Sequence, residues 1–290
     1  MDITGVELAD RRWLGFREHG DPDGRPVLYC HGLPGGGVLA LEPAAMATHR
    51  VRLITVERPG FGSSDPHPGR LLLDVADDIE QLGDTLGLDR FAVLGASAGA
   101  PNALACAHRL GDRVSTVGIV SGVGPLFDHP EFDTILPDQQ QLLLPIARQD
   151  IDGALALVRE VTTPVVEAWA DDPAAAFEAW VQESPEVDRA ALRRDREMWM
   201  EVLDATYGNG ADTFVDEVRA TFGPWGFELA GVGRPVHMWH GDADDMAPLT
   251  VARHVAGQLP DARLTVYPGE GHVLDERHHG DWLGPLTADL

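Results

Sequence analysis

A single serine stands in a pattern that suits nucleophilic chemistry. Ser97 is the centre of the motif Gly-Ala-Ser-Ala-Gly at residues 95–99, which follows a short apolar run from Phe91 and precedes a small-residue run, 98–110, that predicts a helix. Where a strand turns sharply into a helix, this G-x-S-x-G pattern aims the serine hydroxyl outward from the edge of a sheet. The two glycines are needed because such a turn presses the backbones of strand and helix together. We therefore predict that Ser97 is a nucleophile, in preference to an ordinary helix-capping serine.

Pro101 adds a prediction about the backbone of this serine. It lies four residues after Ser97, and in a continuous helix its ring would clash with the carbonyl group of that residue. The clash is avoided if the Ser97 carbonyl turns away from the helix. The sequence thus predicts a strained, non-helical backbone at Ser97.

A serine hydroxyl is a weak nucleophile by itself, and it requires a general base that a carboxylate orients. His272 follows the last predicted strand, 262–267, in a glycine-rich turn, and an acidic segment, 241–248, follows the preceding strand, 235–240. Because the carboxyl ends of parallel strands lie at one edge of a sheet, both segments are expected beside Ser97. The order serine, acid, histidine along the chain is the one expected for this kind of turn.

Several acids compete to be the orienting carboxylate. The segment 241–248 contains Asp242, Asp244 and Asp245, of which the first and the last are typical of turn or capping residues. Asp128, beyond the sixth predicted strand, is a more remote alternative.

The other histidines have plainer interpretations. His31 lies in a His-Gly loop, where a role in holding the turn is favoured over proton transfer, and His240 ends a strand and is expected to pack. His278 and His279 are neighbours that are expected at the surface. No spacing of His, Cys and Asp residues indicates a metal site, so we expect neither a metal ion nor a cofactor.

The elements that must position these residues alternate between strands and helices, which predicts an α/β fold with a mostly parallel, doubly wound sheet. The predicted strands before the acidic segment cover residues 3–8, 12–19, 26–30, 50–57, 91–94 and 114–120. The predicted helices cover residues 38–47, 72–86, 98–110, 249–259 and 281–290.

The alternation of strands and helices stops after the sixth core strand. Residues 126–231 show helix-like patterns broken by proline and no strong strand, which predicts a helical insertion between the core segments 1–125 and 232–290. Four of the seven tryptophans lie in the insertion: Trp169, Trp180, Trp199 and Trp225. They either line an apolar acyl or aryl pocket or form the core of the insertion, and both interpretations stay open.

Composition excludes several classes of partner. The chain has 47 acidic and 22 basic residues, and its net charge of -25 repels nucleic acid and anionic membranes, so we expect neither as a partner. Every basic residue is Arg, which excludes lysine Schiff-base and P-loop chemistry. Cys30 and Cys106 are expected to be buried small hydrophobes without a disulfide. Residues 1–5 show no signal sequence and no apolar run is long enough to span a bilayer, so we expect a cytoplasmic protein.

Five segments together resemble the α/β-hydrolase superfamily, and the match covers nearly the whole chain outside the insertion. They are residues 31–35, 58–64, 95–99, 241–248 and 269–272. The resemblance implies that the insertion is the family's cap. It also implies that Asp244 is the catalytic acid, because the family's acid lies three residues after a glycine and four before a proline.

An oxyanion requires two backbone N–H donors. The Ala98 N–H is one, because the first N–H groups of a helix have no partner within it. The resemblance implies that Leu33 supplies the second and that His31 and Gly32 form the supporting loop. The His-Gly-x-Pro-Gly form of this loop differs from the three-glycine form of some lipases and esterases, which leaves the second donor open.

The resemblance implies a capped serine hydrolase of the esterase type. Ser97 would attack an acyl carbonyl, His272 would transfer the proton, and Asp244 would orient the imidazole. The expected substrate is a small molecule, a small or medium carboxylic ester that is hydrolysed through an acyl-enzyme. The oligomeric state does not follow from the sequence.

Other activities of the same fold are alternatives. They are an aminopeptidase acting on N-terminal proline, a C–C bond hydrolase, a lactonase and a biosynthetic cyclase. The first would suggest a bulky aromatic residue after the serine, where this chain has Ala98. Epoxide hydrolases and haloalkane dehalogenases are disfavoured because those relatives carry Asp where this chain has Ser97. A non-catalytic ligand receptor on a hydrolase scaffold is the alternative from a different class.

Overall fold

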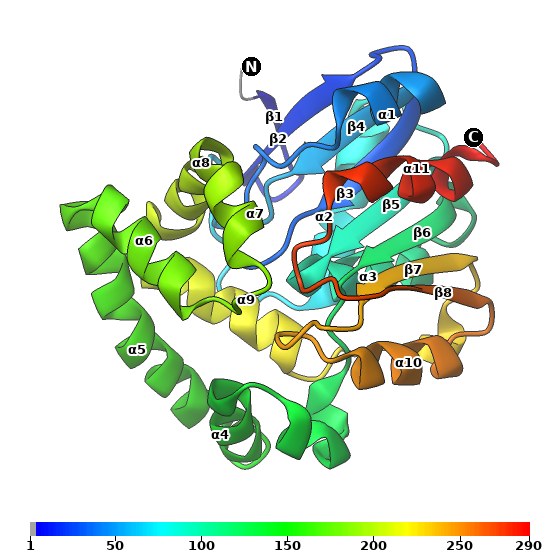
Figure 1. Ribbon diagram of the computed structural model, residues 1–290. Coiled ribbons are helices and arrows are strands. Elements are labelled where there is room, and N and C mark those ends of the chain that lie inside the picture. Colours follow the sequence, from blue (N-terminus) through cyan, green and yellow to red (C-terminus); the bar gives the residue numbers. More distant parts are fainter. Residues whose placement is uncertain (1–3) are drawn as a thin grey trace.

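A central sheet organises the protein. The computed structural model describes residues 4–290, which form an eight-stranded sheet in the order β1-β2-β4-β3-β5-β6-β7-β8 (Figure 1). The strands are β1 (Thr4–Glu7), β2 (Trp13–Gly20), β3 (Arg25–Cys30), β4 (Val51–Val56), β5 (Phe91–Ala96), β6 (Val114–Val120), β7 (Val236–Gly241) and β8 (Ala262–Tyr267). Only the β1–β2 and β2–β4 pairs are antiparallel, so the predicted mostly parallel sheet is confirmed. Residue 3 of the first predicted strand lies outside the described residues.

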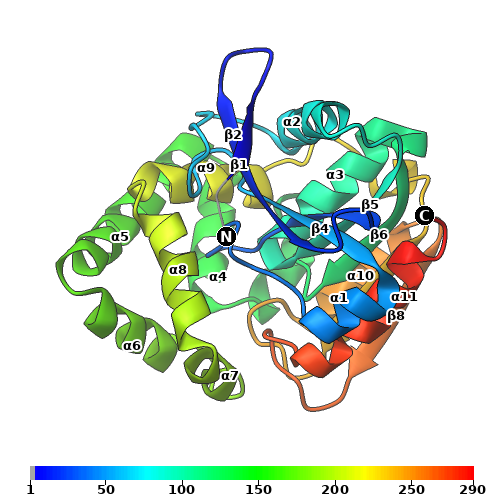
Figure 2. The same cartoon turned by 90° about the horizontal axis from the view of Figure 1, so that it is seen from above.

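Helices cover both faces of this sheet, because successive residues of its buried strands point to opposite sides. Leu28 and Cys30 of β3 pack with α2 (Leu72–Thr85), α3 (Ala100–Leu110) and α10 (Leu249–Gln258). Val27 and Tyr29 of β3 pack on the other face, with α1 (Pro43–His49) and α11 (His279–Thr287). Figure 2 shows α2 and α3 on one side of the strands and α1 and α11 on the other, which is the doubly wound arrangement.

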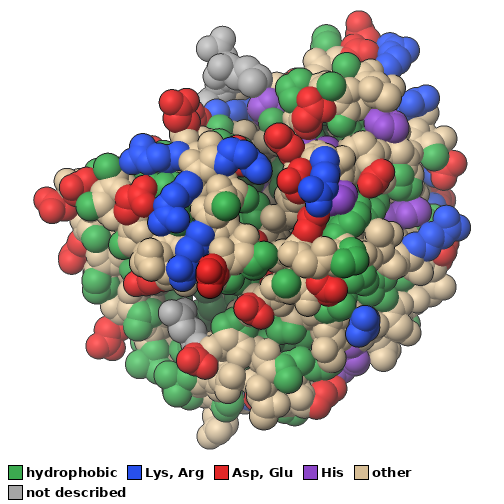
Figure 3. All heavy atoms as spheres, viewed as in Figure 1, with side chains coloured by type: hydrophobic (Ala, Val, Ile, Leu, Met, Phe, Trp, Pro, Cys, Tyr) green, Lys and Arg blue, Asp and Glu red, His purple; other side chains and the backbone are tan. Residues whose placement is uncertain are grey.

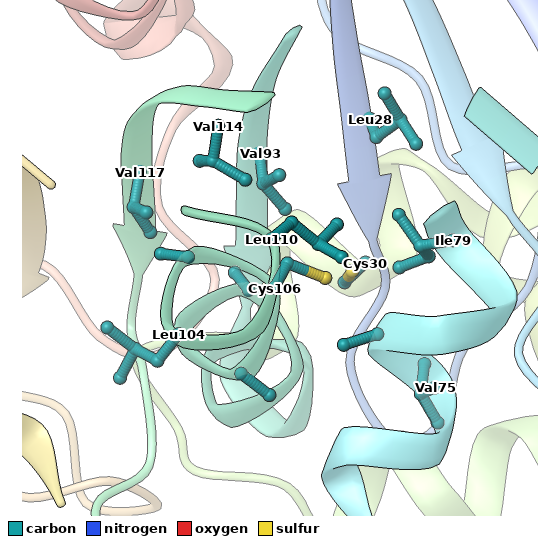
Figure 4. Close-up of a cluster of buried hydrophobic side chains, with 14 of the residues drawn as sticks. Leu28, Cys30, Val75, Ile79, Val93, Leu104, Cys106, Leu110, Val114 and Val117 are labelled. Carbon is teal, nitrogen blue, oxygen red and sulfur yellow. The ribbon is translucent and has the colours of Figure 1, made fainter. Parts of the chain in front are cut away.

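The two cysteines lie in the layer between the sheet and α3. Cys30 and Cys106 are both free and buried, and their side chains are surrounded by aliphatic residues of β3, α2 and α3 (Figure 4). They therefore pack as small hydrophobes, as predicted.

The start of the helix before β4 was predicted wrongly. The helix expected over 38–47 is α1, which begins only at Pro43 and ends at His49. The Glu42 side chain accepts hydrogen bonds from the Ala44 and Ala45 N–H groups, and a proline occupies the first helical position, so both signals start the helix there. The chain leaves the helix at Arg50, whose φ of 50° is left-handed.

The cap is inserted between β6 and β7, after the sixth strand of the sheet. Its helices are α4 (Asp138–Ala147), α5 (Ile151–Asp171), α6 (Pro173–Glu183), α7 (Arg189–Arg194), α8 (Arg196–Tyr207) and α9 (Ala211–Phe222), with short 3-10 turns at Leu126–Asp128, Pro130–Ile135 and Leu229–Gly231. Figure 1 shows these helices beyond the carboxyl ends of the parallel strands. The division at residues 125 and 232 stays a prediction of domain boundaries.

On the face shown in Figure 3, acidic side chains are scattered among hydrophobic and other side chains, and arginines gather over the part formed by α6–α8. Across residues 4–290, no helix combines the length and the apolar character that crossing a membrane demands.

Candidate active site

Ser97 lies at the sharp turn between β5 and α3. Its φ of 51° is left-handed, which confirms the non-helical backbone that Pro101 requires. Neighbouring backbone atoms lie so close to both flanking positions that only glycine fits there. A Cβ on Gly99 would lie 2.0 Å from the Cys30 carbonyl oxygen, and a Cβ on Gly95 would lie 2.5 Å from the Gly99 carbonyl oxygen. A side chain at either position would therefore push the serine out of its place at the end of the sheet.

The structure brings Ser97, His272 and Asp244 together in one hydrogen-bonded chain. Ser97 Oγ lies 2.9 Å from His272 Nε2, and His272 Nδ1 lies 2.9 Å from Asp244 Oδ2. The other carboxylate oxygen of Asp244 accepts hydrogen bonds from the backbone N–H groups of Met246 and Ala247, at 2.9 and 2.8 Å. These bonds fix the carboxylate in the turn after β7, so that it can hold the imidazole ring.

The competing acids lie elsewhere. Asp242 accepts a hydrogen bond from the Gly269 N–H at 2.7 Å, which is a turn contact between the loops after β7 and β8. Asp245 and Asp128 are both exposed. The geometry therefore singles out Asp244 among the candidates.

The electrostatic interaction between Asp244 and His272 favours the charged form of each side chain. Burial opposes ionisation of Asp244, but His272 and a hydrogen bond from His240 outweigh burial, and the pKa of Asp244 lies well below its usual range. Burial likewise opposes protonation of His272, but the Asp244 carboxylate outweighs it and raises the pKa of His272 above its ordinary value. The imidazole is thus prepared to accept a proton from Ser97.

His240 has a role beyond the packing that its position at a strand end predicted. Its Nε2 lies 2.6 Å from the Ala247 carbonyl oxygen and 3.2 Å from Asp244 Oδ2. Both partners only accept hydrogen bonds, so Nε2 carries the proton and donates to them. His240 thereby holds the same oxygen of Asp244, Oδ2, that lies against His272.

The loop after β3 brings the second predicted oxyanion donor close to the serine. A Cβ on Gly32 would lie 3.2 Å from Ser97 Cβ, and both Gly32 and Leu33 line the same cavity as Ser97. Ala98 follows the serine in a short 3-10 turn, Ser97–Gly99, where N–H groups are free of helical partners. The assignment of these two N–H groups to an oxyanion stays a prediction.

His31 is fully buried and holds this loop. Its Nδ1 lies 2.9 Å from the Gly32 carbonyl oxygen, and its Nε2 lies 3.4 Å from the Arg58 backbone nitrogen. Burial and the neighbouring Arg58 charge keep the pKa of His31 well below its ordinary value. The ring is therefore neutral, donates through Nδ1 and accepts through Nε2, which suits a structural role.

A buried ion network that sequence reasoning missed ties the same loop to the cap. Arg58 donates to the His31 and Gly32 carbonyl oxygens. Glu217 on α9 accepts from Arg58 at 2.7 Å and from Arg70 at 2.5 Å, and none of the three side chains is more than 1% exposed. Burial opposes ionisation of Glu217, but the two guanidinium charges outweigh it and lower its pKa. Glu217 is 159 residues from Arg58, so no local pattern signals this contact.

Residues of the cap and the core line a partly open cavity of about 310 Å³ that reaches Ser97 and His272. Two of the four cap tryptophans, Trp180 and Trp199, line it. Trp169 and Trp225 are buried in apolar clusters instead. Trp180 and Trp199 thus line the cavity and also pack against the cap cluster that contains Trp169, whereas Trp225 packs in the cluster of the sheet core.

A second residue that sequence reasoning missed, on the cap, contacts the turn that carries His272. The Asp188 carboxylate accepts hydrogen bonds from the His272 N–H at 3.2 Å and from the Val273 N–H at 3.0 Å. It lies at the start of α7, where an aspartate is ordinarily interpreted as a helix cap, so its position in the sequence does not indicate a contact with His272.

Among residues 4–290, one group has the residue types of a metal site. The nearest ligand atoms of His129, Glu131 and His254 lie within 4.8 Å of one another. None of the three lines the cavity of Ser97. The group joins the start of the cap to α10, and its members are too far apart in the sequence to form a spacing motif.

The chain matches the family model described as the alpha/beta hydrolase fold over residues 25–274. It belongs to this family. The hydrolase is 25% identical to a proline iminopeptidase of Xylella fastidiosa strain Temecula1, over 95% of this chain and 92% of that protein. It is 28% identical to a protein of Leptolyngbya boryana named "Probable proline iminopeptidase", over 90% of this chain and 85% of that protein. Among solved structures, the esterase EaEST from Exiguobacterium antarcticum superposes with a TM-score of 0.70 at 20% identity, over 98% of both chains.

Proposed function

We propose that this hydrolase is a serine hydrolase that cleaves small or medium carboxylic esters through an acyl-enzyme. The observation that carries the proposal is the continuous series of hydrogen bonds from Ser97 through His272 to Asp244, at the wall of a cavity between cap and core. A serine hydroxyl that a histidine and a buried carboxylate activate is the arrangement that acyl transfer requires.

In the proposed mechanism, His272 Nε2 removes the proton from Ser97 Oγ as the oxygen attacks the carbonyl carbon of the ester. Asp244 orients the imidazole and stabilises its positive charge. The N–H groups of Ala98 and Leu33 stabilise the oxyanion. His272 then protonates the departing alcohol, and water, activated by the same histidine, attacks the acyl-enzyme and restores Ser97.

The cavity supports an ester with an apolar part of limited size. Its volume of about 310 Å³ lies at the lower end of the range of ligand pockets. The walls on the cap side include Trp180, Met198 and Trp199, and Trp282 contributes from the core. These residues offer an apolar surface for an acyl or aryl group.

Removal of an N-terminal proline is the second candidate, because both full-length relatives carry the name proline iminopeptidase. Such a substrate presents an ammonium group, which requires negative charge in the cavity. Asp188, Asp195 and Glu276 are among the residues that line it, although Asp188 already accepts from two backbone N–H groups and Asp195 is paired with Arg194. Ala98 after the nucleophile still lacks the aromatic residue that this activity would suggest.

The test combines labelling with two substrate classes. A fluorophosphonate should label wild-type protein and leave Ser97→Ala unlabelled, and the absence of label in folded wild-type protein would overturn the nucleophile. A series of p-nitrophenyl esters of increasing acyl length is then compared with prolyl p-nitroanilide. Higher kcat/KM on an ester supports the esterase proposal, whereas higher kcat/KM on the prolyl substrate replaces it with the aminopeptidase. Labelling without turnover of either class favours a ligand receptor.

A further inference from the structure

We propose that Asp188 of the cap is a positioning residue for His272, so that the cap completes the catalytic site as well as covering it. The proposal rests on the proposed function, because it gives His272 the role of general base. It concerns a residue that is remote in sequence from all three members of the triad.

The carboxylate of Asp188 is committed to the turn that carries the histidine. One oxygen accepts from the His272 N–H at 3.2 Å and the other from the Val273 N–H at 3.0 Å. Asp188 precedes α7, where an aspartate side chain ordinarily accepts from the first N–H groups of its own helix, and no such bond is made here. Its backbone still starts the helix, since the Leu192 N–H donates to the Asp188 carbonyl oxygen. The side chain is thus directed away from local capping and toward the triad.

Gly271 shows how closely the cap approaches this turn. A Cβ at this position would lie 2.3 Å from Asp188 Oδ1 and 2.5 Å from Val187 Cγ1. Any side chain before His272 would therefore displace the carboxylate. The glycine and the carboxylate form one contact, in which the missing Cβ allows both oxygens to reach the backbone of the turn.

Asp188 and Asp244 act on different parts of the histidine. Asp244 accepts from the ring at Nδ1, and Asp188 holds the backbone beneath it. Asp188 is only 2% exposed, and its negative charge adds to that of Asp244 in raising the pKa of His272. Glu270, on the same turn, pairs with Arg277 and His278 instead.

Asp188→Asn is the informative variant, because it keeps the size of the side chain while removing the charge and one of the two acceptors. The loss of negative charge lowers the pKa of His272. A base works in its neutral form, so the acidic limb of the kcat/KM profile moves to lower pH. The altered turn also misplaces the ring, and kcat should fall by up to about 100-fold. Asp188→Ala should show the same shift and a larger loss of kcat.

Asp172→Asn is the matched control. Asp172 is an exposed cap carboxylate that also accepts from two backbone N–H groups, those of Ala174 and Ala175. Both groups belong to its own helix and not to the turn that carries His272. It should leave the acidic limb at its wild-type position. Circular dichroism and thermal melting establish that each variant is folded.

Titration of the His272 imidazole by NMR separates this proposal from the proposed function. If wild-type protein hydrolyses no ester, the NMR pKa of His272 must still be lower in Asp188→Asn than in the wild type and in Asp172→Asn. If folded Asp188→Asn retains both the wild-type imidazole pKa and the wild-type kcat/KM profile, Asp188 does not position the base. A lower kcat with an unmoved pKa would likewise reduce Asp188 to a structural contact and overturn the proposal.

Discussion

Glu217 offers the sharpest test of how the cap and the site depend on each other. The substitution Glu217→Gln keeps the shape of the side chain and removes its charge. It leaves the guanidinium groups of Arg58 and Arg70 buried, with side-chain exposures of 0% and 1%, without their shared carboxylate. Removal of one partner from a buried ion network leaves the remaining charges uncompensated in a medium that solvates them poorly.

The expected loss follows from that burial. Breaking a buried ion pair by removing one partner lowers the free energy of unfolding by about 3–5 kcal/mol, and here two cations lose the same partner. Activity should also fall, because Arg58 donates to the carbonyl oxygens of His31 and Gly32 and so holds the loop that carries Leu33. We expect kcat to fall, and not only KM to rise, because the oxyanion contact strengthens in the transition state.

Urea unfolding at pH 7, followed by circular dichroism and extrapolated to water, measures the loss of stability. Because the native pKa of Glu217 is lowered, its stabilisation is present above the carboxyl pKa of the unfolded chain and is lost as the pH falls through the native value. The variant and the wild type should therefore converge in stability at acidic pH. The control is Asp77→Asn, which breaks the exposed pair with Arg109 and should change stability little. An unchanged urea midpoint and slope in Glu217→Gln would refute the reasoning.

Three further results are expected. Ser97→Ala should lower kcat on the preferred substrate on the order of 10⁴-fold or more at an unchanged melting temperature, and ordinary turnover by the variant would exclude this nucleophile. Asp244→Asn should lower kcat about 10⁴-fold and shift the acidic limb of the pH–rate profile downward, because the charge that raises the pKa of His272 is lost; a profile like the wild type would point to another acid. Gly99→Ala should reduce soluble yield and the melting temperature sharply, since its Cβ would lie 2.0 Å from the Cys30 carbonyl oxygen, and wild-type melting would show that the turn relaxes freely.

Local patterns were sufficient where one segment carries the whole signal. The strand, glycine, serine, glycine and helix around Ser97 lie within twenty consecutive residues. Pro101 indicated a non-helical backbone at Ser97, and the φ of that residue confirms it. The catalytic acid was harder to predict, because Asp242, Asp244 and Asp245 share one turn. The choice among them depends on which side chain the turn directs toward His272. The hydrogen bonds from the Met246 and Ala247 N–H groups to Asp244 decide this. The start of α1 was misplaced because the capping role of Glu42 is visible only once the backbone before Pro43 is known.

The sequence by itself determined the alternation of strands and helices, the position of the cap insertion, the serine and histidine that meet at the carboxyl edge of the sheet, and the turn that supplies their acid. These follow from short-range periodicity, from turn residues and from the rule that parallel strands end together. Only the tertiary structure decided which cap residues touch this edge. Asp188 and Glu217 carry no local signal, because a buried carboxylate is identified by the N–H groups or the guanidiniums that satisfy it, and these come from distant parts of the chain. Tertiary structure also decided which tryptophans line the cavity, because Trp180 and Trp199 reach it only through the packing of the cap helices over the core.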